Sequence, residues 1–165
     1  MNKIFWIYER GLAGRAGPLR HPWDLRDLRR AGIRVILSAA DGLLDPSALA
    51  SADIEHHCVP LPDDVPPSAT TESRCIEALP AIADFIDLNL TQQKGVLVHC
   101  FAGKDRTGLI LSYFVAYKEG ISAADAIRRV RAVQPGALTA AGWEELALRV
   151  IPQVLSETKS RLARG

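Results

Sequence analysis

The segment that decides the fold spans residues 95–108 and reads GVLVHCFAGKDRTG. Its residues 96–98 are apolar and form a run too short to be anything but a buried strand, and a glycine-containing turn follows. A helix is predicted over residues 107–119, where Gly120 provides a suitable C-cap. The segment therefore predicts a strand, a short loop that begins at Cys100, and a helix.

A loop of this kind is suited to hold a phosphate group. Backbone N–H groups at a helix N-terminus lack intrahelical partners and carry a partial positive charge, so they attract anions. The same field favours the thiolate of Cys100, which is the nucleophilic form of cysteine. Arg106 follows six residues later and can return its guanidinium over the phosphate oxygens. The hydroxyl of Thr107 is a candidate donor to the sulfur.

Two other interpretations of this segment are weaker. A lone cysteine after an apolar strand is usually a small core residue, but packing alone does not require a turn of the form HCxxGxxRTG. The pair Gly103-Lys104 also occurs in Walker loops. However, no glycine stands five residues before Gly103, and Asp105 replaces the required Ser or Thr. We therefore interpret Cys100 as a functional residue.

The rest of the chain alternates between predicted strands and predicted helices. Apolar and β-branched runs predict further strands at residues 4–8, 33–37 and 54–59. The Gly- and Pro-containing segment 11–18 is predicted to be a loop. Apolar spacing and capping residues predict helices at residues 22–31, 71–90, 123–133 and 139–157. Ser122 and Thr139 are the predicted N-caps of the last two helices, and Pro80 is expected to kink the helix at 71–90 or delay its start.

This order predicts one α/β domain. We expect a central, mostly parallel sheet of four to five strands with helices on both faces, over residues 1–158. Residues 159–165 are expected to form a frayed tail.

The composition is that of a globular protein without a strong electrostatic field. The chain has 165 residues, of which 48% are hydrophobic and 24% charged, with a formal net charge of +1. We therefore expect no nucleic-acid partner. No apolar run approaches the roughly 20 residues of a membrane span, so stable membrane insertion is not expected. Residues 1–34 carry eight Lys or Arg against three Asp or Glu, an excess that either lines an anion site or forms solvated helix surface.

Three cysteines with no paired spacing argue against a disulfide framework and against a zinc site. We expect a monomer without a metal or other cofactor. We also expect a cytoplasmic location, because a reactive thiolate persists in a reducing compartment. Cys58 is a candidate for a protective disulfide with Cys100 under oxidation. His56 and His57 are neighbours on a predicted strand and should point to opposite faces, which argues against a shared metal.

The sequence resembles the protein-tyrosine-phosphatase superfamily, whose signature is C-x5-R, and is most similar to the small atypical dual-specificity phosphatases. The signature lies in residues 100–106, and weaker similarities extend over nearly the whole chain. The resemblance implies that Cys100 attacks phosphorus and forms a phosphocysteine intermediate, while Arg106 and the loop amides hold the phosphoryl oxygens. It also implies that His99 orients the loop and favours the thiolate, with Thr107 in support. The implied phosphate-binding residues are Phe101, Ala102, Gly103, Lys104, Asp105 and Arg106.

The resemblance also points to an acid on an upstream loop. In several members an Asp stands three residues before a Pro-Pro pair, and Asp63 stands three residues before Pro66 here. Asp64 is adjacent but has the wrong offset, and the alternative role for both Asp side chains is to accept hydrogen bonds from turn amides. One carboxyl group can protonate the leaving oxygen and then activate water. Gln134 is a candidate either to position that water or to cap a helix end, and Trp143 is expected in the core.

The substrate is less determined than the reaction. A phosphorylated protein is the main expectation, with a tyrosine or dual-specificity activity. Lys104 and Asp105 make the loop similar to those of members that act on phosphoinositides, so an inositol phosphate or phosphoinositide substrate is the alternative. Lys104 adds positive charge for a multiply phosphorylated substrate, or it pairs with Asp105 or points to solvent. A phosphate-binding module without turnover and a rhodanese-like sulfurtransferase are the remaining competing functions.

Overall fold

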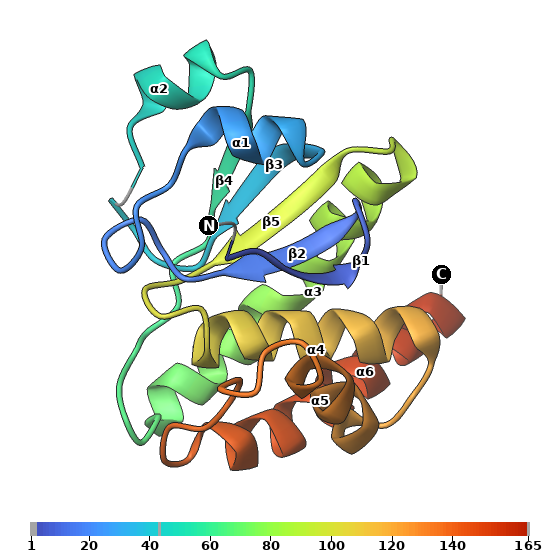
Figure 1. The fold of residues 1–165 in the computed structure, drawn as a ribbon. Helices are drawn as coiled ribbons and strands as arrows, with labels where there is room; N and C mark the ends of the chain where they lie inside the picture. Colours follow the sequence, from blue (N-terminus) through green and yellow to red (C-terminus); the bar gives the residue numbers. More distant parts are fainter. Residues whose placement is uncertain (1–2, 43, 165) are drawn as a thin grey trace.

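The computed structural model describes residues 3–42 and 44–164, which are arranged around a five-stranded sheet (Figure 1). The strand order is β1-β2-β5-β3-β4, in which β1 and β2 pair antiparallel and all other neighbours pair in parallel. The strands are β1 (Phe5–Tyr8), β2 (Leu12–Arg15), β3 (Ile33–Ser38), β4 (Glu55–Cys58) and β5 (Gly95–His99). The central strand β5 is buried along its whole length, because helices cover both faces of a parallel sheet.

Helices lie on both faces of the sheet, as Figure 1 shows. One face carries α1 (Leu25–Arg30) and α2 (Pro46–Ser51). The other face carries α3 (Ala69–Thr91), α4 (Asp105–Glu119), α5 (Ala123–Arg131) and α6 (Trp143–Arg164). The predicted α/β class, with a mostly parallel sheet and helices on both faces, is confirmed.

The larger hydrophobic core lies between the sheet and the helices α3 to α6. Helix α4 occupies its centre, and every residue from Arg106 to Ala116 is buried. A smaller core, which includes Leu28, Ile36 and Leu97, lies under α1 and α2. Core packing therefore holds the start of α4 in place, and it restricts the position of the loop that precedes this helix.

Local capping signals predict most helix ends correctly. Gly120 adopts a left-handed conformation with φ of 68° and ends α4, and the hydroxyl of Ser122 accepts a hydrogen bond from the N–H of Asp125 at the start of α5. The predicted N-cap at Thr139 is wrong, because its hydroxyl donates to the carbonyl of Gly136 and α6 begins only at Trp143. Pro80 lies inside α3 and does not delay the start of that helix.

Two elements differ from expectation, and distant contacts determine the first of them. Part of the predicted loop at 11–18 is strand β2, which pairs with β1 on one side and β5 on the other. Gly14 leaves room for the ring of Phe5, because a Cβ there would lie 2.4 Å from that ring and would displace it. Helix α2 was not predicted; its N-cap is Asp45, whose carboxylate accepts from the N–H of Ser47.

The C-terminal helix α6 extends to Arg164, so it includes most of the segment 159–165 that is expected to fray. Gly165 lies outside the described residues, and the domain boundary at residue 158 stays a prediction. Within residues 3–42 and 44–164, no helix has both the length and the apolar character needed to cross a membrane.

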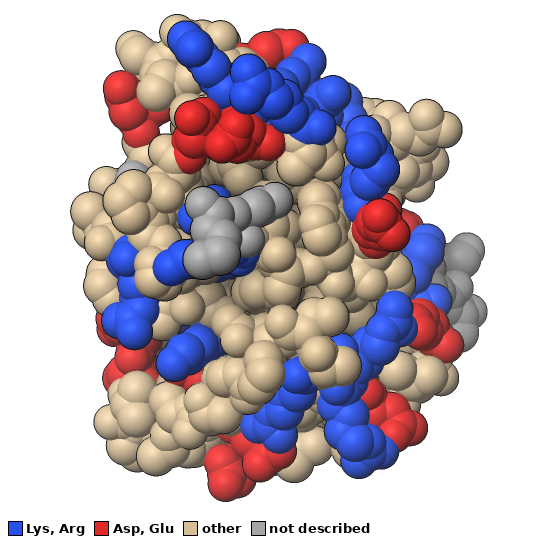
Figure 2. Space-filling view, in the orientation of Figure 1, with Lys and Arg blue, Asp and Glu red and all other residues tan. Residues whose placement is uncertain are grey.

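On the molecular face drawn in Figure 2, basic side chains gather along the top, the right side and the lower centre, with acidic side chains beside many of them. The basic last turn of α5 is an example, because each of its arginines has an acidic partner. The pairs are Arg128 with Asp125, Arg129 with Glu119, and Arg131 with Glu144. In the basic N-terminal segment, Arg29 and Arg30 pair with Asp53 and Asp27. These residues of α1 thus belong to charged surface rather than to an anion site.

Candidate active site

The loop that follows β5 opens onto a cavity of about 200 Å³ near the edge of the sheet where the parallel strands end. Ligands of open α/β sheets bind outside the carboxyl ends of the strands. The residues that line the cavity are Asp63, Cys100, Phe101, Ala102, Asp105, Arg106 and Trp143. The structure therefore brings most of the predicted site together, whereas His99, Gly103, Lys104 and Thr107 support the loop without lining the cavity.

The first two carbonyl groups of the loop are turned away from its inside. The carbonyl oxygen of Cys100 accepts a hydrogen bond from Nδ1 of His99 at 3.1 Å, and that of Phe101 accepts from the N–H of Gly17 at 2.9 Å. The C=O and N–H of one trans peptide point in opposite directions. The N–H groups that follow these two carbonyls are thus directed toward the inside of the loop.

The end of the loop is held in the same way. The side-chain amide of Gln134 donates to the carbonyl oxygen of Gly103 at 3.1 Å. The carbonyl oxygen of Lys104 accepts from the N–H groups of Gly108 at 3.0 Å and Leu138 at 3.3 Å. Helix α4 begins directly afterwards, so its positive N-terminus faces the same side. Inward amides and a helix N-terminus form a concave site suited to a phosphate dianion.

Gly103 allows this loop to pack against strand β2. It has φ of +70°, and a Cβ on it would lie 2.7 Å from backbone atoms of Arg15 and Ala16. A side chain at this position is therefore disfavoured both by the backbone conformation and by the space available. Gly17 makes an equally close approach from the other side, where a Cβ would lie 2.4 Å from the carbonyl oxygen of Cys100.

Cys100 and Arg106 face the cavity from opposite ends of the loop. Cys100 is 2% exposed, and its sulfur accepts a hydrogen bond from the hydroxyl of Thr107 at 3.1 Å. The guanidinium of Arg106 donates through one terminal nitrogen to the carbonyl oxygens of Ala39 and Leu61, both at 3.3 Å. These carbonyls hold one side of the planar guanidinium, and its other N–H groups remain available to an oxyanion.

His99 supports the loop as a neutral residue. It is fully buried, and this burial is the main cause that lowers its pKa to about 4. At neutral pH the ring therefore orients the Cys100 carbonyl through a hydrogen bond and contributes no positive charge.

The loop after β4 distinguishes its two adjacent carboxylates. The carboxylate of Asp64 accepts hydrogen bonds from the hydroxyl of Thr71 and from the N–H of Ser68, the latter at 2.7 Å. The bond from Thr71 contributes most to lowering the pKa of Asp64 below its usual range. Asp64 thus holds the start of α3, whereas Asp63 is the carboxylate of this pair that lines the cavity.

Lys104 and Asp105 do not pair with each other. Among the ion pairs of residues 3–42 and 44–164, none joins these two side chains. The carboxylate of Asp105 accepts from the N–H of Ala140, and the aliphatic part of Lys104 packs where a Cβ on Gly136 would lie, 3.0 Å from it. Asp105 therefore has a structural partner, and Lys104 keeps its ammonium free of that carboxylate.

Two residues have roles at the site that the sequence does not identify. Trp143 is buried as expected, but its ring also lines the cavity and its indole N–H donates to the carbonyl oxygen of Asp64 at 3.1 Å. Gln134 binds backbone at both ends of its side-chain amide, since it also accepts from the N–H of Gly136. Gln134 thus holds the loop that follows β5 and does not cap a helix end.

The remaining candidates from strand β4 lie away from the cavity. Strand β3 separates Cys58 from the end of β5, which places the two strands about 9.6 Å apart at ~4.8 Å per strand spacing. A disulfide requires Cα atoms within about 7 Å, so a direct bond between Cys58 and Cys100 is not supported. His56 and His57 point to opposite faces, as predicted: His56 contacts Ser38, whereas His57 stacks on Phe85 with ring centroids 4.4 Å apart.

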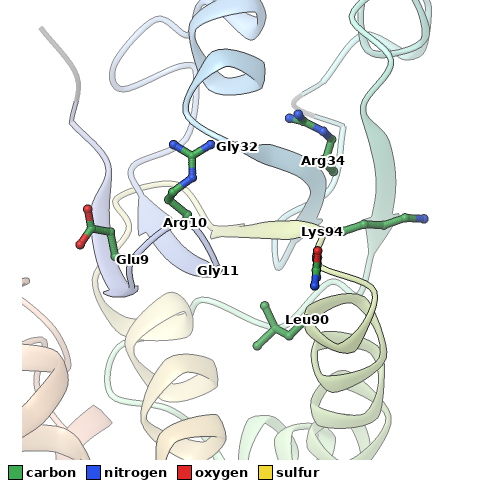
Figure 3. Close-up of a pocket in the computed structure, with 8 residues that line it drawn as sticks. Glu9, Arg10, Gly11, Gly32, Arg34, Leu90 and Lys94 are labelled. Carbon is green, nitrogen blue, oxygen red and sulfur yellow. The ribbon is translucent and has the colours of Figure 1, made fainter.

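A larger cavity, of about 340 Å³, lies at the opposite end of the sheet (Figure 3). The charged ends of Glu9, Arg10, Arg34 and Lys94 point in different directions there and do not converge on one point. Lys94 pairs with a glutamate of β4, and Arg34 donates to backbone carbonyls. This cavity has no cysteine in its lining, so size alone does not make it the active site.

Comparison with known proteins agrees with the geometry of the loop. Residues 23–146 match the family described as "Dual specificity phosphatase, catalytic domain". The chain is 40% identical over 60 residues to "Dual specificity protein phosphatase 1" of Arabidopsis thaliana, a match that covers 36% of this chain and 30% of that protein. The chain thus matches less than a third of that relative's length.

Solved structures show the same fold. The active form of Tk-PTP is similar with a TM-score of 0.74 and 22% identity, over 93% of this chain and 97% of that one. PTPMT1 in complex with PI(5)P is similar with a TM-score of 0.74 and 14% identity, over 95% of this chain and 99% of that one. The resemblance inferred from the C-x5-R segment is confirmed, and the family match covers most of the chain. The chain belongs to the dual-specificity phosphatase catalytic-domain family of the protein-tyrosine-phosphatase superfamily.

Proposed function

We propose that the protein hydrolyses phosphate monoesters in two steps, with Cys100 as the nucleophile. The thiolate attacks phosphorus, a sulfur–phosphorus bond forms, and the bond from phosphorus to the leaving oxygen breaks. The carboxyl group of Asp63 gives its proton to that oxygen. Arg106 and the inward amides of the loop bind the phosphoryl oxygens, where negative charge develops in the transition state.

The second step removes the phosphoryl group from sulfur. The carboxylate of Asp63 takes a proton from a water molecule as it attacks phosphorus, the sulfur–phosphorus bond breaks, and inorganic phosphate leaves. The hydroxyl of Thr107 stabilises the departing thiolate, which it contacts at 3.1 Å. The observation that carries the proposal is that Cys100, Arg106 and Asp63 line one cavity although they come from two distant segments.

The volume of the cavity supports a dual-specificity substrate range. At about 200 Å³ it is smaller than the roughly 300 Å³ at the lower end of ordinary ligand pockets. We infer that it encloses the phosphoryl group and leaves most of the attached side chain outside. Phosphotyrosine, phosphoserine and phosphothreonine of a protein then all reach Cys100.

A phosphoinositide is the second candidate substrate. Lys104 adjoins the phosphate loop and has no ion pair with Asp105, so its charge is available to a second phosphate group. PTPMT1, which shares the fold, has been crystallised with PI(5)P. The cytoplasmic location and the monomeric state stay predictions; three thiols without disulfides are compatible with a reducing compartment.

The decisive experiment compares the two neighbouring carboxylates. Asp63→Asn is expected to lower kcat on an unactivated phosphopeptide by about 10²- to 10⁴-fold. It should lower kcat less on p-nitrophenyl phosphate, whose leaving group needs no proton. Asp64→Asn is the matched control, and Cys100→Ser should abolish turnover. If Asp64→Asn shows the dependence on leaving group instead, Asp63 is not the acid; thiosulfate sulfurtransfer without phosphatase activity would reject the whole proposal.

A further inference from the structure

Three polar side chains form a row beneath the cysteine loop, on three neighbouring strands. His99 ends β5, Ser38 ends β3 directly beside it, and His56 belongs to the edge strand β4. They project from the face covered by α1 and α2, because Ile36 and Leu97, two residues before Ser38 and His99, pack in the smaller core. Neither Ser38 nor His56 lines the catalytic cavity.

In the hydrogen bonds along this row, each group can donate only toward the Cys100 carbonyl. The carbonyl oxygen of Cys100 can only accept, so Nδ1 of His99 carries the hydrogen in their 3.1 Å bond. In the neutral ring Nε2 of His99 must then accept, and its partner is the hydroxyl of Ser38. Since that hydroxyl donates its hydrogen to His99, its oxygen accepts from Nε2 of His56 at 2.8 Å. The donors therefore follow the order His56, Ser38, His99 and the Cys100 carbonyl.

The surroundings of His99 restrict both the charge state and the orientation of its ring. The ring is fully buried, and burial keeps it neutral by lowering its pKa. Trp23 packs against it edge-on, with ring centroids 4.7 Å apart. If the Ser38 hydroxyl were absent, Nε2 would be a buried acceptor without a partner, and the ring would lose the contact that fixes it on that side. A ring held from one side only binds the Cys100 carbonyl less firmly.

The Cys100 carbonyl matters because it shares a peptide with the first N–H of the loop. A hydrogen bond to a carbonyl oxygen polarises the peptide and strengthens the N–H on its other side as a donor. The N–H of Phe101 is directed inward, where it stabilises negative charge on the sulfur or on a bound phosphate. A change at His56 on the protein surface is thereby linked to the charge state of Cys100.

We propose that Ser38 and His56 are positioning residues for Cys100, which act by holding the His99 ring in the orientation from which Nδ1 binds the Cys100 carbonyl. This inference rests on the proposed function only in taking Cys100 as the nucleophile. It goes beyond it by assigning a role to an exposed histidine and a buried serine outside the cavity.

Other charges face the same ring, and those of the arginines must stay constant in the test. The charge of His56 itself lowers the pKa of His99, as do the charges of Arg106 of α4 and Arg15 of β2, and His57 is the neighbouring charge for His56. Substitutions at Ser38 and His56 leave both arginines in place. The measured effect then reports on the hydrogen-bond chain and not on the field of the arginines.

The test measures the reactivity of Cys100 without any substrate. The rate of alkylation by iodoacetamide is followed against pH, by mass spectrometry of the peptide that carries Cys100. His56→Leu removes the donor at an exposed position, and His56→Gln restores an N–H donor of similar reach. Ser38→Ala breaks the chain at its centre. His57→Leu is the matched control, because His57 lies on the other face of the same strand.

We expect Ser38→Ala to move the alkylation midpoint upward by about one pH unit, which corresponds to a roughly tenfold slower reaction below the midpoint. His56→Leu should move it in the same direction by less, and His56→Gln and His57→Leu should match the wild type. The proposal is overturned if His56→Leu leaves the midpoint unchanged, or if His57→Leu shifts it equally. Because no substrate is used, a shifted midpoint in a protein without phosphatase activity would reject the proposed function and uphold the chain.

Discussion

Gly103→Ala should damage the loop around Cys100, and Gly120→Ala provides a control with almost the same backbone. The two glycines have φ of +70° and +68°, so alanine at either position costs about 1–2 kcal/mol for the left-handed conformation. At Gly120 nothing lies within 4 Å of the added Cβ. The control variant is therefore destabilised by backbone strain alone.

At Gly103 the added Cβ would lie 2.7 Å from backbone atoms of Arg15 and Ala16. Strand β2 is paired on both sides and resists movement, so the overlap adds about 1–3 kcal/mol. The total is about 2–5 kcal/mol, against about 1–2 kcal/mol for the control. One kcal/mol lowers the Tm of a domain of this size by about 2–4 °C.

The loop can relieve this overlap only by moving away from β2, and this displacement changes the catalytic geometry. A shift of about 1 Å at a reacting group costs about 100-fold in rate. We expect Gly103→Ala to lower kcat/KM for p-nitrophenyl phosphate by at least that factor, while Gly120→Ala keeps the wild-type value. Thermal melts and steady-state assays of both variants provide the measurement. Equal losses of Tm and equal kcat/KM in the two variants would refute the argument that the contact with β2 fixes the loop.

Three further predictions concern single side chains at the site. Thr107→Ala should slow the second step, lower kcat about tenfold or more and produce a burst of p-nitrophenol, because a hydrogen bond to the departing thiolate is lost; an unchanged kcat would contradict this role. Lys104→Ala should lower activity on a phosphoinositide more than on a phosphotyrosine peptide, and an unchanged ranking would exclude Lys104 from substrate selection. The folded-state pKa of Asp64 is depressed from 3.8, chiefly by the hydroxyl of Thr71 and then by the N–H of Ser68. Its ionised carboxylate therefore stabilises the fold above that value and loses this effect as the pH falls through the lower, folded-state pKa. The Tm deficit of Asp64→Asn at pH 7 should accordingly shrink in melts as the pH is lowered below 3.8, and a constant deficit would contradict the assignment.

Features encoded by neighbouring residues are predictable from the sequence. The strand, loop and helix around Cys100 follow from an apolar run, a glycine-containing turn and a capping glycine at residue 120. The cap at Ser122 follows equally from its own neighbours. In each case the physical cause lies within a few residues of its effect, so reading along the chain is sufficient.

Features that depend on distant contacts are not predictable in this way. Strand β2 has the sequence LAGR, without a β-branched or aromatic residue, and exists because two neighbours pair with it. Gln134 reaches the loop across 31 positions of sequence, and Trp143 reaches Asp64 across 79. His56 carries no local signal at all, since its partner Ser38 becomes visible only when the strands are placed side by side.

The anchoring of Arg106 has a consequence for how the chain acquires its chemistry during folding. Its guanidinium is held by carbonyls that precede it by 67 and 45 positions, at the ends of two different segments. Contacts of such large sequence separation form late, after the cost of closing long loops has been met. A partly folded chain that already contains the Cys100 segment thus lacks a positioned arginine. The proposed phosphoryl transfer therefore requires the finished fold.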